Sequence, residues 1–348
     1  MIYLVSQDWS NTSNNHAGIK HLCNKLQDLY PDLYRSLVIP CYMDDRILSK
    51  NIFFKKLQVR YARYQTKVFI KSIIDYFCIT LKSNDIVFFM EYFERLSPMN
   101  ILAETIHSSF PNVKLWGMVH LIPHKLSVAY PNDSELNDCQ KNISKIFTLG
   151  HSLSDYLIQR GVRRDKIVTT FHYVDNYYMV SQIRQHPKVK VIAMGNQVRN
   201  LKLLRAIVAA NPCVDFTICQ GVIDMSDEFV GLNNVSLIPF VLEPDLRQYM
   251  LESDISLNAM QDTIGSNVIV SSLAMGLAMI CSDVGSIRDY CDDSNTIFCD
   301  NNDVESFSKA IRMLSTNMDL LKKMKEAARM KSRCFSIENF SKEIEKKV

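Results

Sequence analysis

The sequence predicts an α/β protein with two Rossmann-like domains, each built on a parallel sheet. The chain has 348 residues, which is too long for one typical core and about right for two domains of roughly 150 residues each. Short apolar runs of strand length alternate with longer amphipathic stretches from end to end. The apolar runs are continuous, as in parallel strands that helices cover on both faces through right-handed crossovers.

Twelve apolar runs are candidate strands. They are residues 1–6, 36–41, 85–91, 113–120, 145–150 and 166–172 in the first half, and 189–195, 215–221, 235–240, 255–260, 278–283 and 296–300 in the second. The polar stretch 175–188 contains Pro187 and is the predicted linker. We therefore expect an N-terminal domain at 1–180, a C-terminal domain at 181–330, and a helix at 331–348 that packs back toward the N-terminal domain.

The composition is that of a soluble globular protein, with 47% hydrophobic and 22% charged residues. A net charge of +3 is too small to indicate nucleic acid, and we expect no nucleic-acid partner. The first apolar run is too short for a signal peptide, and no run approaches the roughly 18 residues that span a bilayer. We expect a cytoplasmic protein.

The cysteines and histidines do not indicate a metal site. The ten cysteines form no CxxC pair, and several lie inside apolar runs, so we interpret them as reduced core residues. His120 and His124 have helical spacing, but Pro123 argues against the helix that would bring them together. The sequence predicts no metal ion and no cofactor.

The first candidate binding turn follows the strand at 189–195, at a carboxyl end where ligands collect in open parallel sheets. Gly195 permits a tight exit, and Asn196, Arg199 and Lys202 lie at or near the start of the next helix. Helix-terminal N–H groups with one or two fixed cations are suited to a diphosphate. The alternative is an ordinary solvated first turn.

A second candidate turn is "DTIGSNVIVSS" at 262–272. Gly265, Ser266 and Asn267 precede an apolar helix and expose backbone donors that can bind an anion or sugar hydroxyls. The alternative is an ordinary loop with an N-cap. Two such turns in one half of the chain favour a binding role.

The first half offers further polar residues at predicted strand ends. His120 ends one strand and Glu91 another, while His16 and Gly18 lie where the first helix begins. A lone histidine is more often a structural donor than a catalyst, and an ion pair with Arg95 is the alternative for Glu91. Gly18 permits close approach of a ligand, or marks a helix entry.

Residues 50–71 form a basic and aromatic segment without an acidic residue. Its basic and aromatic residues are Lys50, Lys55, Lys56, Arg60, Arg63, Lys67 and Lys71, and Phe53, Phe54, Tyr61, Tyr64 and Phe69. Such a helix can lie on an anionic membrane surface, where each basic residue contributes about 1 kcal/mol. Single-stranded nucleic acid could use the same interleaving, and a solvated helix face is the third reading. We favour the membrane surface.

From about Val189 to the C-terminus the sequence resembles the donor domain of retaining GT-B glycosyltransferases of glycosyltransferase family 4, also called glycosyl transferases group 1. "SSLAMGLAMICSDVGSIRDYC" is similar to the family's "EAMACGxPVVASDVGGxxEVV", and "NTIFCDNNDVESFSKAIRML" to "NGLLVxPxDxExLAxAIxxLL". "NNVSLIPFVLEPDLRQYMLESDISLNAM" matches the order of strand, turn, short helix and strand that precedes them. In the first half, "KIFTLGHSLSDYLIQRGVRRDKIVTTFHYVD" resembles the family's "vSexlrdxLxxxGvxxxKIxVIpNGVD".

The resemblance implies roles for individual residues. Arg199 occupies about the place of the family's diphosphate-binding lysine, and Lys202 is the alternative if the alignment is shifted. Asn196 replaces the family's arginine after the glycine. His120 resembles the histidine of the family's His-Asp pair, although Leu121 replaces the aspartate. The implied catalytic residues are therefore His120 and Arg199.

The resemblance also assigns the second turn to the donor. Where the family has E-x-x-x-x-x-x-x-E, this sequence has Thr263 and Ser271, with Asp262 beside the first. Ser271 would hydrogen-bond the nucleotide ribose, but without the charge that strengthens a carboxylate's bond. Gly18 resembles the glycine of the first-domain loop. The implied donor-binding residues are Gly18, Asn196, Arg199, Lys202, Asp262, Thr263, Gly265, Ser266, Asn267 and Ser271.

The resemblance implies a retaining, metal-independent glycosyltransferase with the GT-B fold, two Rossmann-like domains that face each other across a cleft. The N-terminal domain would bind the acceptor, with His16 and Glu91 as acceptor-side candidates, and the C-terminal domain a nucleotide-diphosphate sugar. We expect a lipid-linked or polysaccharide acceptor in bacterial surface polysaccharide biosynthesis, such as O-antigen or capsule. The protein would be peripheral on the inner face of the plasma membrane.

Two other functions remain open. A non-catalytic GT-B subunit of a glycosyltransferase complex would explain the replaced glutamates, since binding without turnover does not require them. A GT-B-shaped epimerase would act on a free nucleotide sugar and would not need the basic aromatic segment.

Overall fold

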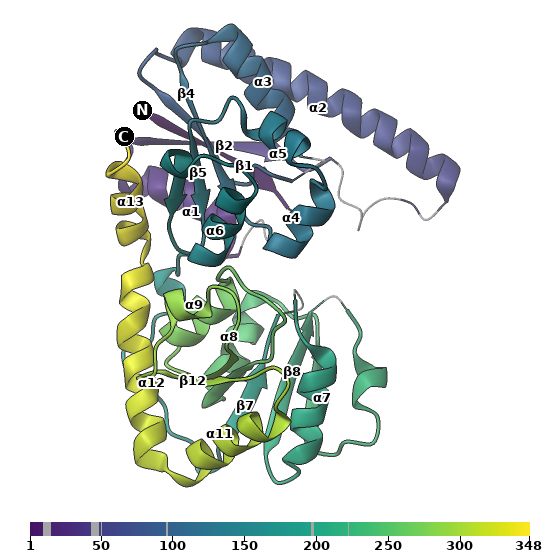
Figure 1. The fold of residues 1–348 in the computed structure, drawn as a ribbon, viewed down its shortest axis with the longest axis vertical. Coiled ribbons are helices and arrows are strands. Elements are labelled where there is room, and N and C mark those ends of the chain that lie inside the picture. The colour runs from purple at the N-terminus through teal and green to yellow at the C-terminus, as the bar shows by residue number, and fades with distance from the viewer. Residues whose placement is uncertain (10–14, 43–48, 50, 95–96, 196–197, 222) are drawn as a thin grey trace. The chain divides into compact units, whose positions relative to one another are not determined.

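The computed structural model describes residues 1–9, 15–42, 49, 51–94, 97–195, 198–221 and 223–348. It divides into two compact units, Met1–Leu149 with Leu153–Thr170, and Gly150–Ser152 with Phe171–Val348. Each unit contains a six-stranded parallel sheet within the described residues, with helices between the strands (Figure 1). The predicted α/β class with two Rossmann-like domains is confirmed.

The first unit has the strand order β2-β1-β3-β4-β5-β6. Its strands are β1 (Ile2–Asp8), β2 (Tyr34–Pro40), β3 (Ile86–Phe89), β4 (Lys114–Val119), β5 (Lys145–Thr148) and β6 (Ile167–Thr169). Every neighbouring pair is parallel, and Val5 of β1 pairs with both Leu37 and Phe89. All six predicted strands of the first half are confirmed; the inner strand β3 is buried throughout, whereas the edge strand β2 is only partly buried.

The connecting helices of the first unit differ greatly in length. They are α1 (Ile19–Leu29), α2 (Ile52–Thr80), α3 (Met99–Ser109), α4 (Pro123–Ala129), α5 (Asp133–Gln140) and α6 (His151–Gln159). Helix α2 has 29 residues, and its buried residues run from Ala62 to Phe77. Its amino-terminal turns extend beyond the body of this unit (Figure 1). Its first residues are therefore solvent-exposed.

The second unit has the strand order β12-β11-β10-β7-β8-β9. Its strands are β7 (Lys190–Ala193), β8 (Asp215–Gly221), β9 (Val235–Pro239), β10 (Ile255–Asn258), β11 (Ala278–Ser282) and β12 (Thr296–Cys299). Its α-helices are α7 (Leu201–Ala210), α8 (Glu243–Leu251), α9 (Asn267–Ala274), α10 (Ile287–Tyr290), α11 (Val304–Thr316), α12 (Met318–Ser332) and α13 (Ile337–Glu345). The six predicted strands of the second half are confirmed as well.

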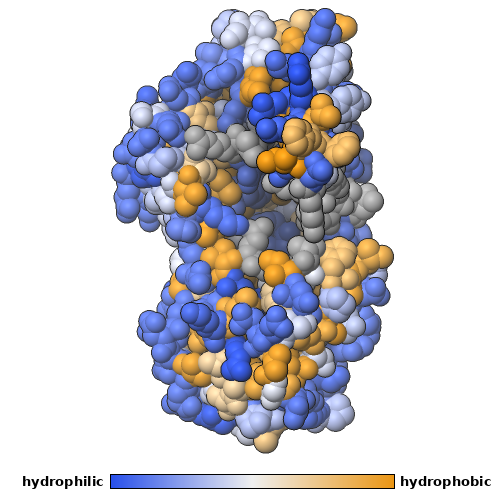
Figure 2. All heavy atoms as spheres, turned by 90° about the vertical axis from the view of Figure 1, so that its right-hand side faces the viewer, coloured by the Kyte–Doolittle hydropathy of each residue, from blue (hydrophilic) through white to orange (hydrophobic). Residues whose placement is uncertain are grey.

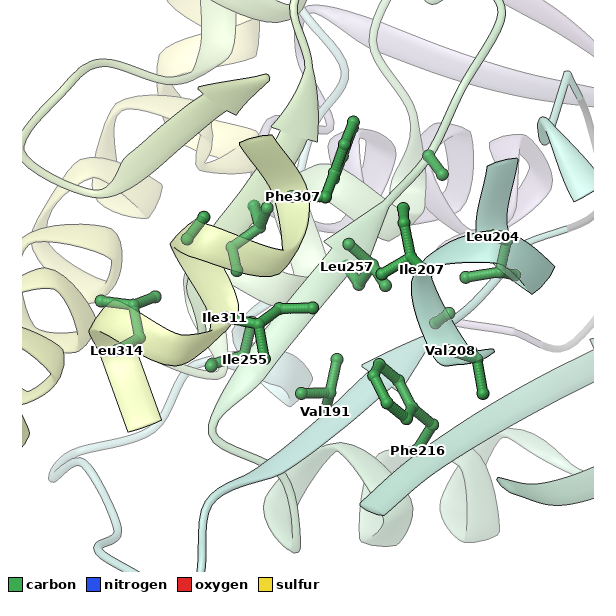
Figure 3. Close-up of a cluster of buried hydrophobic side chains, with 14 of the residues drawn as sticks. Val191, Leu204, Ile207, Val208, Phe216, Ile255, Leu257, Phe307, Ile311 and Leu314 are labelled. Atoms are coloured by element: carbon green, nitrogen blue, oxygen red, sulfur yellow. The ribbon is translucent and has the colours of Figure 1, made fainter. Parts of the chain in front are cut away.

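One face of this second sheet packs against α7 and α11. Val191, Phe216 and Ile255 project from the strands toward Ile207 of α7 and Ile311 of α11, and all five are buried (Figure 3). Burying a side chain of this size contributes about 1.5–3 kcal/mol relative to leaving it exposed. The cluster fixes β7 and β10 side by side, and the loops after these two strands contain the candidate donor site.

The two compact units divide at residues 149–153 and 170. The domain boundaries predicted at 180 and 330 stay predictions. Contacts place the last helix, α13, in the second unit, where Ser336 bridges to Val174. The expected packing of 331–348 toward the N-terminal domain also stays a prediction.

Candidate functional site

The candidate donor site lies at the switch point of the second sheet. β7 lies between β8 and β10, and the chain runs outward through β8 and β9 before it returns to β10. Loops that leave neighbouring strands in opposite directions open a crevice at such a point, beyond the carboxyl ends of the strands. The loops here contain Arg199 after β7 and Asp262 after β10.

Arg199 is held beside the β10 loop by an isolated antiparallel bridge to Met260. The Asn200 N–H donates to the Ala259 carbonyl at 2.9 Å, and the Gln261 N–H donates to the Val198 carbonyl at 2.8 Å. Val198 adopts a left-handed conformation with φ of 60°, which is costly for a β-branched residue. The bridge therefore maintains a strained turn that presents Arg199.

The guanidinium of Arg199 has no acidic partner within the described part of the chain. It donates to the Cys219 carbonyl at 3.4 Å and approaches the Met225 sulfur at 3.7 Å. Burial lowers the pKa of Arg199 to about 10, because desolvation opposes its positive charge. A partly buried cation without a carboxylate is suited to an anionic ligand.

The turn after β10 is fixed by two glycines. Gly265 has φ of +96°, and a Cβ there would lie 2.2 Å from the ring and hydroxyl of Tyr290. Gly285 has φ of +54°, and a Cβ there would lie 2.2 Å from the Thr263 carbonyl oxygen. Only glycine adopts these conformations and approaches at little cost. The Ser286 N–H donates to the same Thr263 carbonyl at 2.7 Å and closes the contact.

The two predicted binding turns come together at the start of α9. A Cβ on Gly195 would lie 3.0 Å from the Val268 side chain, so the β7 exit packs on the first turn of α9. Ser266 caps α9, its hydroxyl accepting from the Ile269 N–H at 3.3 Å. The first turn of α9, which contains Asn267, therefore points toward the loop that presents Arg199, and its dipole favours an anion there.

The positions that the resemblance assigns to glutamates are occupied differently. Thr263 is buried, and its hydroxyl accepts from the Gly265 N–H at 3.1 Å. The Asp262 carboxylate accepts from the Thr263 N–H at 2.8 Å, and burial raises its pKa. Ser271 is buried in α9, and its hydroxyl has no hydrogen-bond partner among the described residues. That hydroxyl is available to a ligand.

Two other predicted donor residues are less informative. Lys202 is exposed in the first turn of α7, after the Asn200 cap that accepts from the Leu203 N–H. Asn196 lies outside the described residues. Of the two predicted cations, Arg199 is the one whose backbone is bridged to the β10 loop in the described residues.

Glu91 lies at the switch point of the first sheet, just after β3. Its carboxylate accepts from the Trp9 indole N–H at 2.7 Å and from the Gln7 N–H at 3.0 Å. Burial raises the pKa of Glu91 to about 7, although both hydrogen bonds oppose the shift. Arg95, the expected ion-pair partner, lies outside the described residues.

His120 follows β4, and its Nε2 lies 2.8 Å from the Met90 carbonyl oxygen. Since a carbonyl only accepts, Nε2 must bear the proton, which fixes the tautomer of the neutral ring. Burial lowers the pKa of His120 to about 4. His120 is thus a neutral donor to the backbone beside Glu91, and its catalytic role stays a prediction.

The start of α1 contains the remaining two predicted residues. Gly18 is buried and precedes α1 in an extended conformation with φ of −83°, which any residue adopts, so its backbone does not require glycine. The His16 ring lies 4.8 Å from the His21 ring. Their roles toward a ligand stay predictions.

Sequence reasoning did not identify Val198, Tyr290, Gly285 or Trp9 as parts of these sites. Val198 and Gly285 act through backbone geometry that no local pattern signals. One local signal could have pointed to Trp9. It directly follows the first strand, and ligands bind at the carboxyl ends of parallel strands.

Two features are absent from the described residues. No group of three or more His, Cys, Asp or Glu side chains in this part of the chain could hold a metal ion. Among the same residues, no helix has the length and apolar character needed to cross a membrane.

Residues 177–317 match the family model described as "Glycosyl transferases group 1". No curated protein matches the chain. Among solved structures, the chain is similar to a sucrose-phosphate synthase from Thermosynechococcus elongatus, with a TM-score of 0.74, 10% identity, and coverage of 99% of this chain and 98% of that one.

Two further structures are similar over their full length. One is Anabaena HepE in complex with UDP and glucose, with a TM-score of 0.68, 14% identity, and coverage of 100% of this chain and 99% of that one. The other is the lipopolysaccharide outer core galactosyltransferase WaaB in its apo form, with a TM-score of 0.68, 13% identity, and coverage of 100% and 99%.

The fold is that of GT-B glycosyltransferases, and the GT-B prediction is confirmed. The match to the glycosyl transferases group 1 model lies within the second unit. The domain match and the structural neighbours together support a glycosyltransferase.

Proposed function

We propose that this protein is a retaining, metal-independent glycosyltransferase that uses a nucleotide-diphosphate sugar. The observation that carries this proposal is the guanidinium of Arg199, which comes from the loop at the switch point of the second sheet, contacts Cys219 and Met225, and has no acidic partner in the described residues. HepE is described in complex with UDP and with UDP-glucose, which supports a uridine nucleotide as the first donor to test.

The chemistry requires stabilisation of the leaving group. The bond between C1 of the donor sugar and the diphosphate oxygen breaks, and its electron pair stays on the diphosphate. A new bond joins C1 to the acceptor oxygen on the same face of the sugar, and the acceptor proton passes to the leaving diphosphate. Arg199 and the first N–H groups of α9 would stabilise the developing negative charge. Ser271 would hydrogen-bond the ribose and His120 the sugar.

We propose a lipid-linked or polysaccharide acceptor in bacterial surface polysaccharide biosynthesis. The likeness to WaaB, described as a lipopolysaccharide outer core galactosyltransferase, supports this class of acceptor. An enzyme that acts on lipid-linked material benefits from a membrane-contact surface, which concentrates it at its substrate.

Helix α2 offers such a surface. Five apolar or aromatic side chains form a stripe along it, each between 48% and 76% exposed: Phe53, Leu57, Tyr61, Tyr64 and Val68. The buried stripe of the same helix begins at Ala62. Ala62 follows Phe53 by nine positions, which is two and a half helical turns. The two residues therefore lie on opposite sides of the helix, and the exposed stripe faces away from the core.

A basic row runs beside this apolar stripe. Its members are Lys56, Arg60, Arg63 and Lys67. Lys56 follows Phe53 by three positions, which places the two rows next to each other on the helix surface. Figure 2 views the molecule from the side toward which the amino-terminal end of α2 points in Figure 1, and shows hydrophobic and hydrophilic side chains intermixed there. Apolar residues in the acyl boundary and cations at anionic headgroups are the pattern of an interfacial helix.

The protein would then be a cytoplasmic enzyme, peripheral on the inner face of the plasma membrane. No described helix is suited to cross a bilayer, so this proposal rests on surface contact by α2.

A second candidate is a non-catalytic GT-B subunit of a glycosyltransferase complex. It is favoured by Thr263 and Ser271, which stand where the resemblance expects two glutamates. Nucleotide binding without transfer, together with a tightly bound partner protein, would identify it.

The donor site is tested by thermal-shift and calorimetric measurements with UDP, GDP, CDP, TDP and ADP. Wild type is compared with Arg199→Ala and with Arg205→Ala, an exposed arginine of α7 that serves as the matched control. We expect stabilisation by one nucleotide, its loss in Arg199→Ala at a cost of about 1.5–3 kcal/mol, and its retention in Arg205→Ala. No stabilisation by any nucleotide, or an equal loss in both variants, contradicts the proposal.

A further inference from the structure

A hollow of about 50 Å³ lies at the carboxyl edge of the first sheet. It is lined by Gln7, Trp9, Pro40, Thr66, Glu94, Ser97 and Pro98. The chain leaves β1 to form β2 on one side and returns to form β3 on the other, so this edge is the switch point of that sheet. Crevices at switch points are where open parallel sheets bind ligands.

Gln7 lines this hollow and has a buried acceptor without a partner. Its side chain is only 6% exposed, and Oε1 has no hydrogen-bond partner in the described residues. An unpaired buried amide oxygen costs free energy that a ligand hydroxyl would recover. The residue is thus suited to a hydroxyl donor.

Glu94 adds a negatively charged acceptor. Its carboxylate makes no hydrogen bond within the described residues, and burial raises its pKa, partly offset by the charge of Lys125. A carboxylate residue and an amide residue therefore line the same hollow. This set of acceptors suits a group rich in hydroxyl hydrogens and repels phosphate and carboxylate groups.

Trp9 contributes an apolar wall. Its indole N–H is used by the Glu91 carboxylate at 2.7 Å, so the ring offers the hollow only apolar surface. A planar aromatic face packs against the C–H groups of a sugar ring, while the ring's hydroxyls remain available at its edge. Glu91 acts here as a positioning residue, because it orients Trp9 and also accepts from the Gln7 backbone N–H at 3.0 Å.

We propose that this hollow binds a neutral sugar of the acceptor. The inference rests on the proposed glycosyltransferase function and adds the acceptor's chemical class. The volume of about 50 Å³ has room for roughly four water-sized groups, which suits a hydroxymethyl group or a pair of hydroxyls rather than a whole sugar ring. The rest of the ring lies over Trp9, with hydroxyls bonded to Gln7 and Glu94. A uronic acid or a phosphorylated sugar is excluded.

The test is saturation-transfer NMR on the full chain with methyl α-glucoside, methyl α-galactoside, methyl N-acetyl-α-glucosaminide and methyl α-glucuronide. We expect signals from at least one neutral glycoside and none from the glucuronide. Gln7→Met keeps the side-chain volume and removes the acceptor, and should weaken binding about fivefold. Glu94→Gln should weaken it similarly and reduce the discrimination against the glucuronide. Glu104→Gln, an exposed position of α3, is the matched control and should bind like wild type.

The proposal is overturned if no neutral glycoside binds, if the glucuronide binds equally well, or if Gln7→Met and Glu94→Gln bind like the control. It is also overturned if Arg199→Ala abolishes the glycoside signal, since the sugar would then occupy the donor site. Nucleotide binding is measured on the same samples. Nucleotide binding that persists while glycosides fail rejects the hollow alone, whereas failure of every nucleotide rejects the proposed function.

Discussion

Arg199 and Met260 face each other in an isolated antiparallel bridge that joins the loops after β7 and β10. The bridge links two segments that sequence reasoning identified separately as binding turns. It accompanies a left-handed conformation of Val198 and holds the backbone of Arg199 against the β10 loop, while the guanidinium lies against the Cys219 carbonyl at the end of β8. The donor-site proposal depends on this relationship.

Gly285→Ala should disturb the donor turn. The new Cβ would lie 2.2 Å from the Thr263 carbonyl oxygen, so the turn must shift, and nucleotide affinity should fall about tenfold or more. Gly231→Ala is the matched control, because Gly231 has φ of +83° with no atom within 4 Å of a Cβ. The control should lose only about 1–2 kcal/mol of unfolding free energy from backbone strain. Chemical denaturation and nucleotide titration measure both effects. Equal nucleotide affinity in the two variants would refute the role of Gly285.

Glu91→Gln should remove a pH dependence of stability. The folded pKa of Glu91 is about 7 against an ordinary value of 4.5, so the folded state favours the protonated form. Its contribution is fully present below pH 4.5 and is lost as the pH rises through 7, by about 3 kcal/mol. The free energy of unfolding of wild type should therefore fall relative to Glu91→Gln between pH 4.5 and pH 8. Parallel curves for the two proteins would show that Glu91 is not desolvated.

His120→Gln should remove a pH dependence of the opposite sign. The folded pKa of His120 is about 4 against an ordinary 6.5, because burial disfavours the imidazolium. Its contribution is present above pH 6.5 and is lost as the pH falls toward 4, again by about 3 kcal/mol. Glutamine retains an N–H donor for the Met90 carbonyl, so the variant should fold. Denaturation curves at pH 4.5 and pH 7.5 compare the two proteins, and a wild type that gains stability on acidification relative to the variant would contradict this account.

Charge reversal on α2 should release the protein from anionic membranes. Lys56→Glu combined with Arg60→Glu replaces two cations beside the exposed apolar stripe, and each is worth about 1 kcal/mol at such a surface. Cosedimentation with vesicles of phosphatidylglycerol and phosphatidylcholine should fall at least tenfold. The control is Lys322→Glu with Lys323→Glu on α12, which should bind like wild type. Unchanged cosedimentation of the α2 variant would remove the membrane proposal.

The sheets could be predicted because their information is local. Every one of the twelve apolar runs forms a strand, and the inner strands β3, β10 and β11 are buried throughout, as expected where helices cover both faces of a parallel sheet. The full length of α2 was harder to predict from the sequence. The basic segment at 50–71 was identified, but the helix continues to Thr80. Its last turns are held by the burial of Ile73 and Phe77, which depends on segments distant in the sequence.

The sites could be predicted only in part. Arg199 and Gly265 were accessible because a glycine or a cation beside a helix start is a local signal. The hollow lined by Trp9 and Glu94 was not, because it depends on β1 and β3 being neighbours. The same is true of Val198, whose left-handed backbone results from pairing with the β10 loop and leaves no trace in the residue type.

The most direct test is the release of a nucleoside diphosphate from the matching nucleotide sugar, with wild type, Arg199→Ala and Arg205→Ala compared at equal concentration. The account predicts turnover by wild type and Arg205→Ala, and a rate roughly 100-fold lower in Arg199→Ala, since loss of one group that stabilises developing charge typically costs this much. Turnover by Arg199→Ala at the wild-type rate would contradict the claim that this guanidinium stabilises the leaving diphosphate.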